Sequence, residues 1–151
     1  MTQIQKCTLV PTRFFDEKVS RCILSDLFPL EDTEQVHHLA IPRFDAVMVY
    51  AGDTVPVLCG MLDALERCTE YNKVLVSFCD GAVHIVLAQG GKLLLANSYP
   101  AADFTTAEYF IFFAMKSLQL NPEVSTITMM TDISGEEEMS LYRYFKSVER
   151  I

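Results

Sequence analysis

The chain has 151 residues, of which 50% are hydrophobic and 21% charged, so it suits one globular domain with a sizeable core and is too apolar for a disordered protein. No apolar run reaches the ~18 residues of a membrane-spanning helix, and the first residues lack the basic region and long apolar core of a signal peptide. The formal net charge is −8, and Lys and Arg form no cluster, which disfavours a nucleic-acid partner.

Residues 1–69 are predicted to form an N-terminal αββα segment that packs on the rest of the chain. Apolar side chains first recur at a helical spacing, two strand-like runs follow, and a proline marks the first turn of a last short helix. The predicted elements are a helix over residues 14–27, strands over residues 36–41 and 46–51, and a helix that begins near Pro56.

Residues 70–151 give a clearer pattern and are predicted to form the core. Asp80-Gly81 joins two apolar runs and fits a two-residue type I′ hairpin turn, in which both central residues have positive φ. The predicted elements are strands over residues 73–79, 82–88 and 92–98, an apolar helix over 105–120, a strand over 124–130 and an amphipathic helix over 134–148.

This β-β-β-α-β-α order predicts the topology of the core. Three strands meander antiparallel, and the helix then crosses over so that the fourth strand returns parallel to the first. The arrangement is ribonuclease-H-like and is the building block of actin-like ATPases. The predicted fold class is therefore α/β, a ribonuclease-H-like mixed sheet corresponding to one actin-like half, with the αββα segment at its N-terminus.

Several runs of the core also carry a family resemblance. They are a strand that ends in Asp80-Gly81, the run GKLLLANS over residues 91–98, a helix that opens with TAEY at 106–109, and LQLNP at 118–122. Together they resemble a bacterial family of uncharacterised proteins with an actin-like ATPase fold, and residues 9–31 resemble that family's middle region. The resemblance implies no assigned activity, and an outline similar to the actin-like proteins of pilus and secretion assembly.

Typical members of that family are longer and have two ribonuclease-H-like halves. By this resemblance the chain carries little of the first half. It is then either a naturally short member or a piece of a longer protein, and the sequence leaves both open.

Nucleotide binding is the first candidate chemistry that the resemblance raises. Actin-like ATPases hold phosphates on hairpin turns with Gly, Ser or Thr, because backbone N–H groups must approach the oxygens closely. Here the Asp80-Gly81 turn has one Gly and no hydroxyl. Three glutamates come soon after Ser134, and a capping box between Ser134 and Glu137 fits this helix start better than a bound phosphate does. We expect no cofactor; the alternative nucleotide-binding residues are Asp80, Gly81, Ser134 and Gly135.

Divalent-metal chemistry is the second candidate. Ribonuclease-H-like nucleases hold two metal ions between acidic residues on the first strand, the long helix and the fourth strand, and Asp80, Glu108 and Asp132 occupy those elements in that order. Each also has a structural interpretation. Asp80 is a turn residue, Glu108 is a capping-box partner of Thr105, and Asp132 caps or turns the chain after a strand. The main expectation is therefore no catalytic or metal-binding residue, with these three acids as the alternative.

The histidines and cysteines indicate neither a metal site nor a nucleophile. His37 and His38 are adjacent in a strand and so point to opposite faces, and His84 is typical of a hydrogen-bonded strand residue. Asp80 should raise the pKa of the neighbouring Cys79 thiol, and no base-orienting motif supports a Cys79–His84 pair. Five scattered cysteines without a C-x-x-C pair indicate reduced thiols and a cytoplasmic protein.

The long helix is apolar almost all round, which predicts burial between the sheet and another layer. In the alternative interpretation one of its sides docks a partner or a second protomer. The side chains concerned are Phe104, Tyr109, Phe110, Phe112, Phe113 and Met115.

These observations predict a protein of unassigned function with a degenerate actin-like fold, which acts as a non-catalytic binding or assembly module through a protein partner or self-association. The alternatives are a metal-dependent phosphodiesterase or nuclease, and a residual ATP-binding protein. Enzyme activity is not expected, although the sequence leaves it open.

Overall fold

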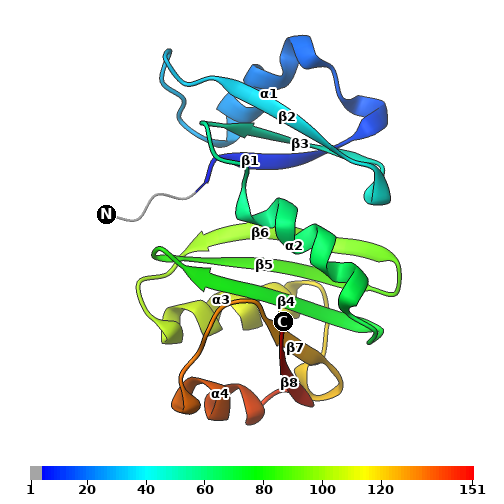
Figure 1. The fold of residues 1–151 in the computed structure, drawn as a ribbon, viewed down its shortest axis with the longest axis vertical. Coiled ribbons are helices and arrows are strands. Elements are labelled where there is room, and N and C mark those ends of the chain that lie inside the picture. Colours follow the sequence, from blue (N-terminus) through cyan, green and yellow to red (C-terminus); the bar gives the residue numbers. More distant parts are fainter. Residues whose placement is uncertain (1–4) are drawn as a thin grey trace. The chain divides into compact units, whose positions relative to one another are not determined.

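The computed structural model describes residues 5–151, and they divide into two compact units, 5–59 and 60–151 (Figure 1). The division falls within the short helix α2 (Val57–Ala64), ten residues before the boundary proposed from the sequence. Each unit has its own sheet. No helix among residues 5–151 is long and apolar enough to span a membrane.

The N-terminal unit is a three-stranded antiparallel sheet with one helix. Strands β2 (Val36–Ile41) and β3 (Ala46–Ala51) match the two predicted strands, and β3 also pairs with β1 (Cys7–Pro11) in the order β1-β3-β2. Strand β1 was missed, because it is short and ends in a proline at the sheet edge. The unit is therefore βαββ rather than αββ before α2.

The helix of this unit is shorter than predicted. Helix α1 (Ser20–Leu27) follows two single 3₁₀ turns, Thr12–Phe14 and Glu17–Val19. The Asp16 side chain caps the second turn by accepting from the Lys18 N–H, and so interrupts the helical spacing. Buried Leu24 then packs with Val10 and Val49 to form the core of the unit.

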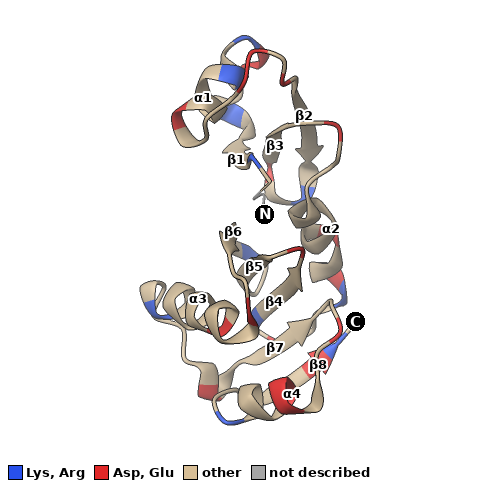
Figure 2. Cartoon of the chain, turned by 90° about the vertical axis from the view of Figure 1, so that its left-hand side faces the viewer, with Lys and Arg blue, Asp and Glu red and all other residues tan. Residues whose placement is uncertain are grey.

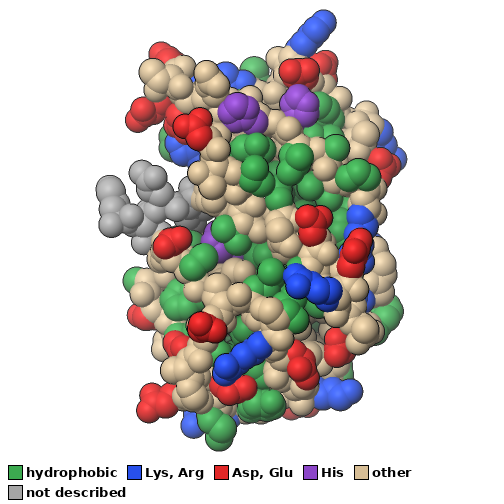
Figure 3. All heavy atoms as spheres, in the orientation of Figure 1, with side chains coloured by type: hydrophobic (Ala, Val, Ile, Leu, Met, Phe, Trp, Pro, Cys, Tyr) green, Lys and Arg blue, Asp and Glu red, His purple; other side chains and the backbone are tan. Residues whose placement is uncertain are grey.

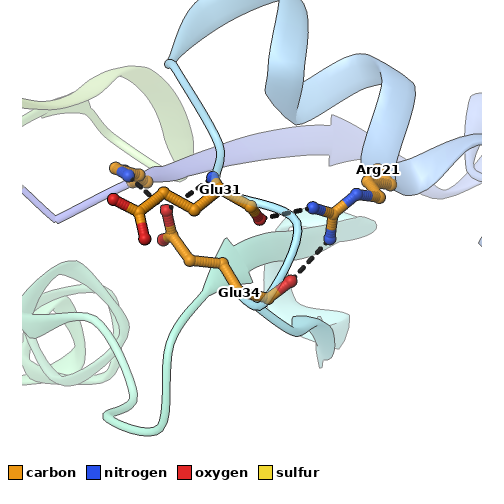
Figure 4. A network of polar contacts seen from close by, with 4 residues as sticks. Arg21, Glu31 and Glu34 are labelled. Atoms are coloured by element: carbon orange, nitrogen blue, oxygen red, sulfur yellow. Dashed lines mark hydrogen bonds and ion pairs between the residues drawn. The ribbon is translucent and has the colours of Figure 1, made fainter.

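A polar network holds the connection between α1 and β2 (Figure 4). The Arg21 guanidinium donates to the backbone carbonyls of Glu34 at 2.5 Å and Glu31 at 2.7 Å. The Glu34 carboxylate accepts from the Lys6 ammonium at 2.7 Å and from the Glu31 N–H at 3.0 Å. These hydrogen bonds lower the pKa of Glu34 below its ordinary value. The network thus satisfies backbone groups of a connection that has no regular structure of its own.

The C-terminal unit contains a five-stranded mixed sheet in the order β6-β5-β4-β7-β8. Strands β4, β5 and β6 form an antiparallel meander, and β7 and β8 run parallel to β4. The predicted parallel return of the fourth strand, and with it the ribonuclease-H-like fold class, is confirmed. The bounds are β4 Asn72–Cys79, β5 Ala82–Gln89, β6 Lys92–Pro100, β7 Thr126–Met129 and β8 Ser147–Arg150.

The last predicted helix is in fact a helix and a strand. Helix α4 (Gly135–Tyr142) ends well before the predicted residue 148, and β8 follows after a short connection. Four residues are too few for an alternating pattern to show, and no Gly or Pro separates the two elements in the sequence. Strand β8 adds one strand to the predicted sheet.

Helix α3 (Phe104–Ser117) and α4 pack against the sheet and bury its core (Figure 2). Helix α3 contributes the buried side chains Ala107, Ile111, Ala114 and Met115, which recur every three or four residues. Helix α4 contributes Leu141, which is fully buried. The sheet contributes Val74, Val76, Val83, Ile85, Leu87, Ile127 and Met129.

Candidate functional site

The Asp80-Gly81 turn is a two-residue reversal between β4 and β5. Cys79 pairs with Ala82 across the hairpin, and φ is 53° at Asp80 and 73° at Gly81. Positive φ at both central residues confirms the predicted type I′ turn. The Gly81 carbonyl accepts a hydrogen bond from the Ala101 N–H at 2.9 Å, so the turn also holds the end of β6 in place.

The chain after β7 lies at the same sheet edge as this turn. Strands β4 and β7 are parallel, with Val76 opposite Met129 in the register. Beyond the strands, the Thr131 hydroxyl accepts from the Phe78 N–H at 2.9 Å. Because the carboxyl ends of parallel neighbours meet at the same edge of a sheet, Asp80 and Asp132 lie at one edge.

Glu108 of α3 is bound to the neighbouring helix. The Ser140 hydroxyl of α4 lies 2.9 and 3.0 Å from the two carboxylate oxygens of Glu108 and donates to them. Burial raises the pKa of Glu108 above its ordinary value, while Ser140 and Arg143 lower it in part. The interpretation of Glu108 as a capping partner of Thr105 is wrong, because the helix is capped by Asp103, whose carboxylate accepts from the Thr106 N–H at 2.8 Å.

The three alternative metal ligands do not form a cluster. Within residues 5–151, no three His, Cys, Asp or Glu side chains are grouped so that they could hold a metal ion. Asp80 and Asp132 share the sheet edge, whereas Glu108 is bonded to α4.

The Ser134–Glu137 capping box is confirmed. The Ser134 hydroxyl accepts from the Glu137 N–H at 3.1 Å, and the Glu137 carboxylate accepts from the Ser134 N–H at 2.8 Å. Glu136 and Glu138 lie in the same first turn of α4, where carboxylates interact favourably with the helix dipole. Ser134, one of the alternative nucleotide-binding residues, therefore caps α4, and Gly135, another, is the first residue of that helix.

His84 is a hydrogen-bonded residue of the central hairpin, as its position in a strand suggested. It is buried, and its Nδ1 lies 2.7 Å from the Ser98 hydroxyl on β6, while Ser77 pairs with it from β4. Burial lowers the pKa of His84, and Asp80 opposes that shift in part. Sequence reasoning missed Ser98, because only the register of β5 and β6 brings it to His84.

The thiol of Cys79 is poorly suited to nucleophilic chemistry. Burial raises its pKa, and the neighbouring Asp80 carboxylate raises it further, in the direction that the sequence predicted. Burial also raises the pKa of the Cys7 thiol, to about 12. None of the five cysteines forms a disulfide.

The outer side of α3 presents aromatic rings to solvent. Tyr109 is 62% exposed and Phe113 is 54% exposed, and their rings stack at a centroid distance of 6.2 Å. The ring of Tyr109 also meets Phe110 at 5.4 Å, and Phe110 stacks on Tyr99 of β6 at 4.8 Å. The prediction that this helix is buried on both sides is wrong for this outer side. We call Tyr109 and Phe113 the aromatic face of α3.

A solved structure from Bacteroides thetaiotaomicron VPI-5482 is similar to this chain. It is described as a protein with an actin-like ATPase fold and unknown function, and the two structures have a TM-score of 0.82 at 18% sequence identity. The match covers 98% of this chain and 65% of that protein, so the chain spans about two thirds of its length. At this identity the likeness shows the fold alone, and it confirms the actin-like fold.

Comparison by sequence identifies a family but no individual curated protein. No curated protein matches the chain. One family model, described as a protein of unknown function, matches residues 52–148 and so includes the whole five-stranded sheet apart from the end of β8. The chain therefore belongs to the DUF3822 family.

Proposed function

We propose that the protein is a non-catalytic binding module that uses the aromatic face of α3 to engage a protein surface. The observation that carries the proposal is the exposure of Tyr109 and Phe113, which stack on each other outside the core. Large aromatic rings dominate the energetics of protein interfaces, because each removes a large apolar area from water. Burying one such ring contributes about 1.5–3 kcal/mol.

The interactions of the alternative metal-binding and nucleotide-binding residues support a module without the ATPase chemistry. Asp80 forms a tight turn, Glu108 accepts from Ser140, and Ser134 caps α4. Each interaction has a role in the stability of the fold. A reduced bacterial cytoplasm is the compartment that we propose, since none of the five cysteines forms a disulfide.

A protein partner suits this chain better than nucleic acid does. On the face drawn in Figure 3, the Lys and Arg side chains are interspersed with Asp and Glu side chains. The whole chain carries a net charge of −8. Both features oppose binding to a phosphate backbone.

Residual metal or nucleotide binding is the alternative, and one observation favours it. The parallel pairing of β4 and β7 brings Asp80 and Asp132 to one sheet edge. A phosphodiesterase would use these two acids with Glu108, and a nucleotide site would use Asp80 and Gly81 with the start of α4.

A thermal melt with Mn²⁺, and separately with ATP and Mg²⁺, tests the loss of chemistry. A ligand at a hundred times its Kd stabilises a protein by about 2.7 kcal/mol, which shifts the melt by several degrees. We expect no shift with either ligand. A shift that disappears in Asp80→Asn would favour the alternative.

The binding role is tested with a defined probe, a fluorescein-labelled amphipathic helix made of Leu and Lys, by fluorescence anisotropy. We expect Tyr109→Ser and Phe113→Ser to weaken binding at least tenfold. Val124→Ser is the matched control, because Val124 is also exposed but lies outside α3. None of these substitutions changes the net charge, so equal binding by all variants would mean that the aromatic face does not take part.

A further inference from the structure

We propose that Cys7 of β1 and Cys59 of α2 form an intrachain disulfide when the chain meets a peroxide, and that this bond ties the start of α2 to the N-terminal sheet. Both residues belong to the compact unit 5–59, and neither forms a disulfide in this structure. The inference follows from how the start of α2 is held beside β1, and it does not depend on the binding surface proposed for α3.

A hydrogen bond joins the chain before β1 to the first residue of α2. The Val57 N–H donates to Oε1 of Gln5 at 2.8 Å. Gln5 comes two residues before Cys7, and Val57 comes two residues before Cys59. Each end of this hydrogen bond therefore lies two residues from a cysteine.

The alternation of side chains along β1 directs Cys7 to the face from which Gln5 reaches α2. The Lys6 carbonyl accepts from the Ala51 N–H at 3.0 Å, so the pairing with β3 continues past the start of β1. Residues two apart in paired backbone of this kind point to the same face, which Gln5 and Cys7 share. Val10 points to the opposite face, where it packs on α1.

Both thiols are shielded from water and interact with each other. Cys59 is 5% exposed. Burial, and to a lesser degree the charge of a Cys59 thiolate, raise the pKa of Cys7 to about 12. The mutual electrostatic effect agrees with two sulfur atoms that are neighbours. Since Cys7 is protonated at neutral pH, we expect the pair to be reduced until an oxidant is present.

Closure of the pair is a two-electron oxidation in which hydrogen peroxide is the oxidant. One thiolate attacks the peroxide and becomes a sulfenic acid, which releases the first water molecule after proton transfer. The second thiol then displaces the sulfenic oxygen as the second water molecule. Overall, two S–H bonds and one O–O bond break, one S–S bond forms, and both thiol protons end in water.

The raised pKa of Cys7 also affects how long the bond persists. A thiol with a high pKa is a poor leaving group in thiol–disulfide exchange, so other thiols should reduce this disulfide slowly. We therefore expect an oxidised state that outlasts the peroxide.

The bond closes a loop that contains α1, β2 and β3. A disulfide across a loop of about 50 residues stabilises a protein by restricting its unfolded chain. The loop ends in α2, the helix within which the two compact units divide. We expect the oxidised chain to melt at least about 5 °C above the reduced chain.

Peptide mapping of the full chain tests the proposal. The chain is treated with hydrogen peroxide at pH 8, blocked with N-ethylmaleimide, digested with trypsin and analysed by mass spectrometry without reduction. Cleavage after Lys6, Arg13, Arg43 and Arg67 places Cys7 in peptide 7–13 and Cys59 in peptide 44–67, each with a single cysteine. We expect the pair of peptides 7–13 and 44–67 to be the main disulfide product.

Two variants control the assay. Cys59→Ala should abolish the link, whereas Cys22→Ala should leave it unchanged, because Cys22 is an exposed thiol of α1. Peroxide also oxidises methionine, so Cys59→Ala treated in the same way is the reference for the change in Tm. Circular dichroism confirms that each variant is folded.

The wild-type chain alone can overturn the proposal. Absence of the link between peptides 7–13 and 44–67 would do so. A mixture of disulfides in the folded chain like that formed in concentrated urea would also do so, because the folded structure would then not select the pair. A link that forms without raising Tm above that of treated Cys59→Ala would refute the tie between α2 and the sheet.

Discussion

Removing the Ser140 hydroxyl should loosen the contact between α3 and α4. In Ser140→Ala, both oxygens of the Glu108 carboxylate lose the donor that lies 2.9 and 3.0 Å away. A hydrogen bond to a charged group contributes about 1.5–3 kcal/mol, and since this pair is only partly buried we expect about 1.5 kcal/mol. In a chain of this size that loss lowers Tm by about 3–6 °C.

The loss should depend on pH. The hydroxyl favours the carboxylate form, so its removal raises the pKa of Glu108 further above the ordinary value. The difference in the free energy of unfolding between Ser140→Ala and the wild-type chain therefore has its full size at pH values above the pKa of Glu108 in the variant. It shrinks as pH falls through that pKa, where both chains carry a neutral carboxyl group.

The assay is urea unfolding followed by circular dichroism at pH 7 and at pH 4. Ser147→Ala is the control, because Ser147 bonds an exposed carboxylate, that of Glu149, at 3.2 Å. Equal stability of the two variants at pH 7 would refute the assignment of a stabilising role to the Glu108–Ser140 contact. An equal deficit of Ser140→Ala at both pH values would refute the electrostatic reasoning.

Four further substitutions test other features. Burial lowers the pKa of His84, so stability should fall as pH drops below about 6.5, and His84→Gln should remove that part of the dependence in melts between pH 7 and 5. Gly81→Ala places a side chain at φ 73° and should cost about 1–2 kcal/mol in urea unfolding, whereas Gly135→Ala, where a Cβ meets no atom within 4 Å, should stabilise α4 by about 0.5–1 kcal/mol. Arg21→Ala removes both carbonyl contacts of the connection before β2 and should make that connection the first site of limited proteolysis, detected by mass spectrometry; unchanged cleavage sites would contradict it.

Local patterns were enough to predict most of the core. The apolar runs of β4, β5 and β6 predicted the antiparallel meander, and Asp80-Gly81 predicted the type of the turn. Both features depend on residues that are close in sequence. The capping box of Ser134 and Glu137 was likewise predicted from a spacing of three residues.

The features that were missed depend on neighbours distant in sequence or on very short elements. Strands β1 and β8 have five and four residues, and their pairing partners define them more than their own pattern does. The Glu108–Ser140 and His84–Ser98 contacts join residues 32 and 14 positions apart. Nothing in the sequence of α3 distinguishes the exposed Phe113 from the partly buried Phe112. The difference arises because the rings of Tyr144 and Phe145, which follow α4, pack on Phe112.

The parallel return of β7 has a consequence for the order of folding. The meander of β4, β5 and β6 needs only tight turns, and hairpins of this kind form within about 1–10 μs. Strand β7 can pair with β4 only after α3 has crossed the sheet, so this closure has a larger entropic cost and is slower. Until then the inner edge of β4 has unpaired N–H and C=O groups beside Val74 and Val76. A nascent chain that stops between β6 and β7 therefore presents an apolar strand edge, the kind of surface on which incompletely folded chains aggregate.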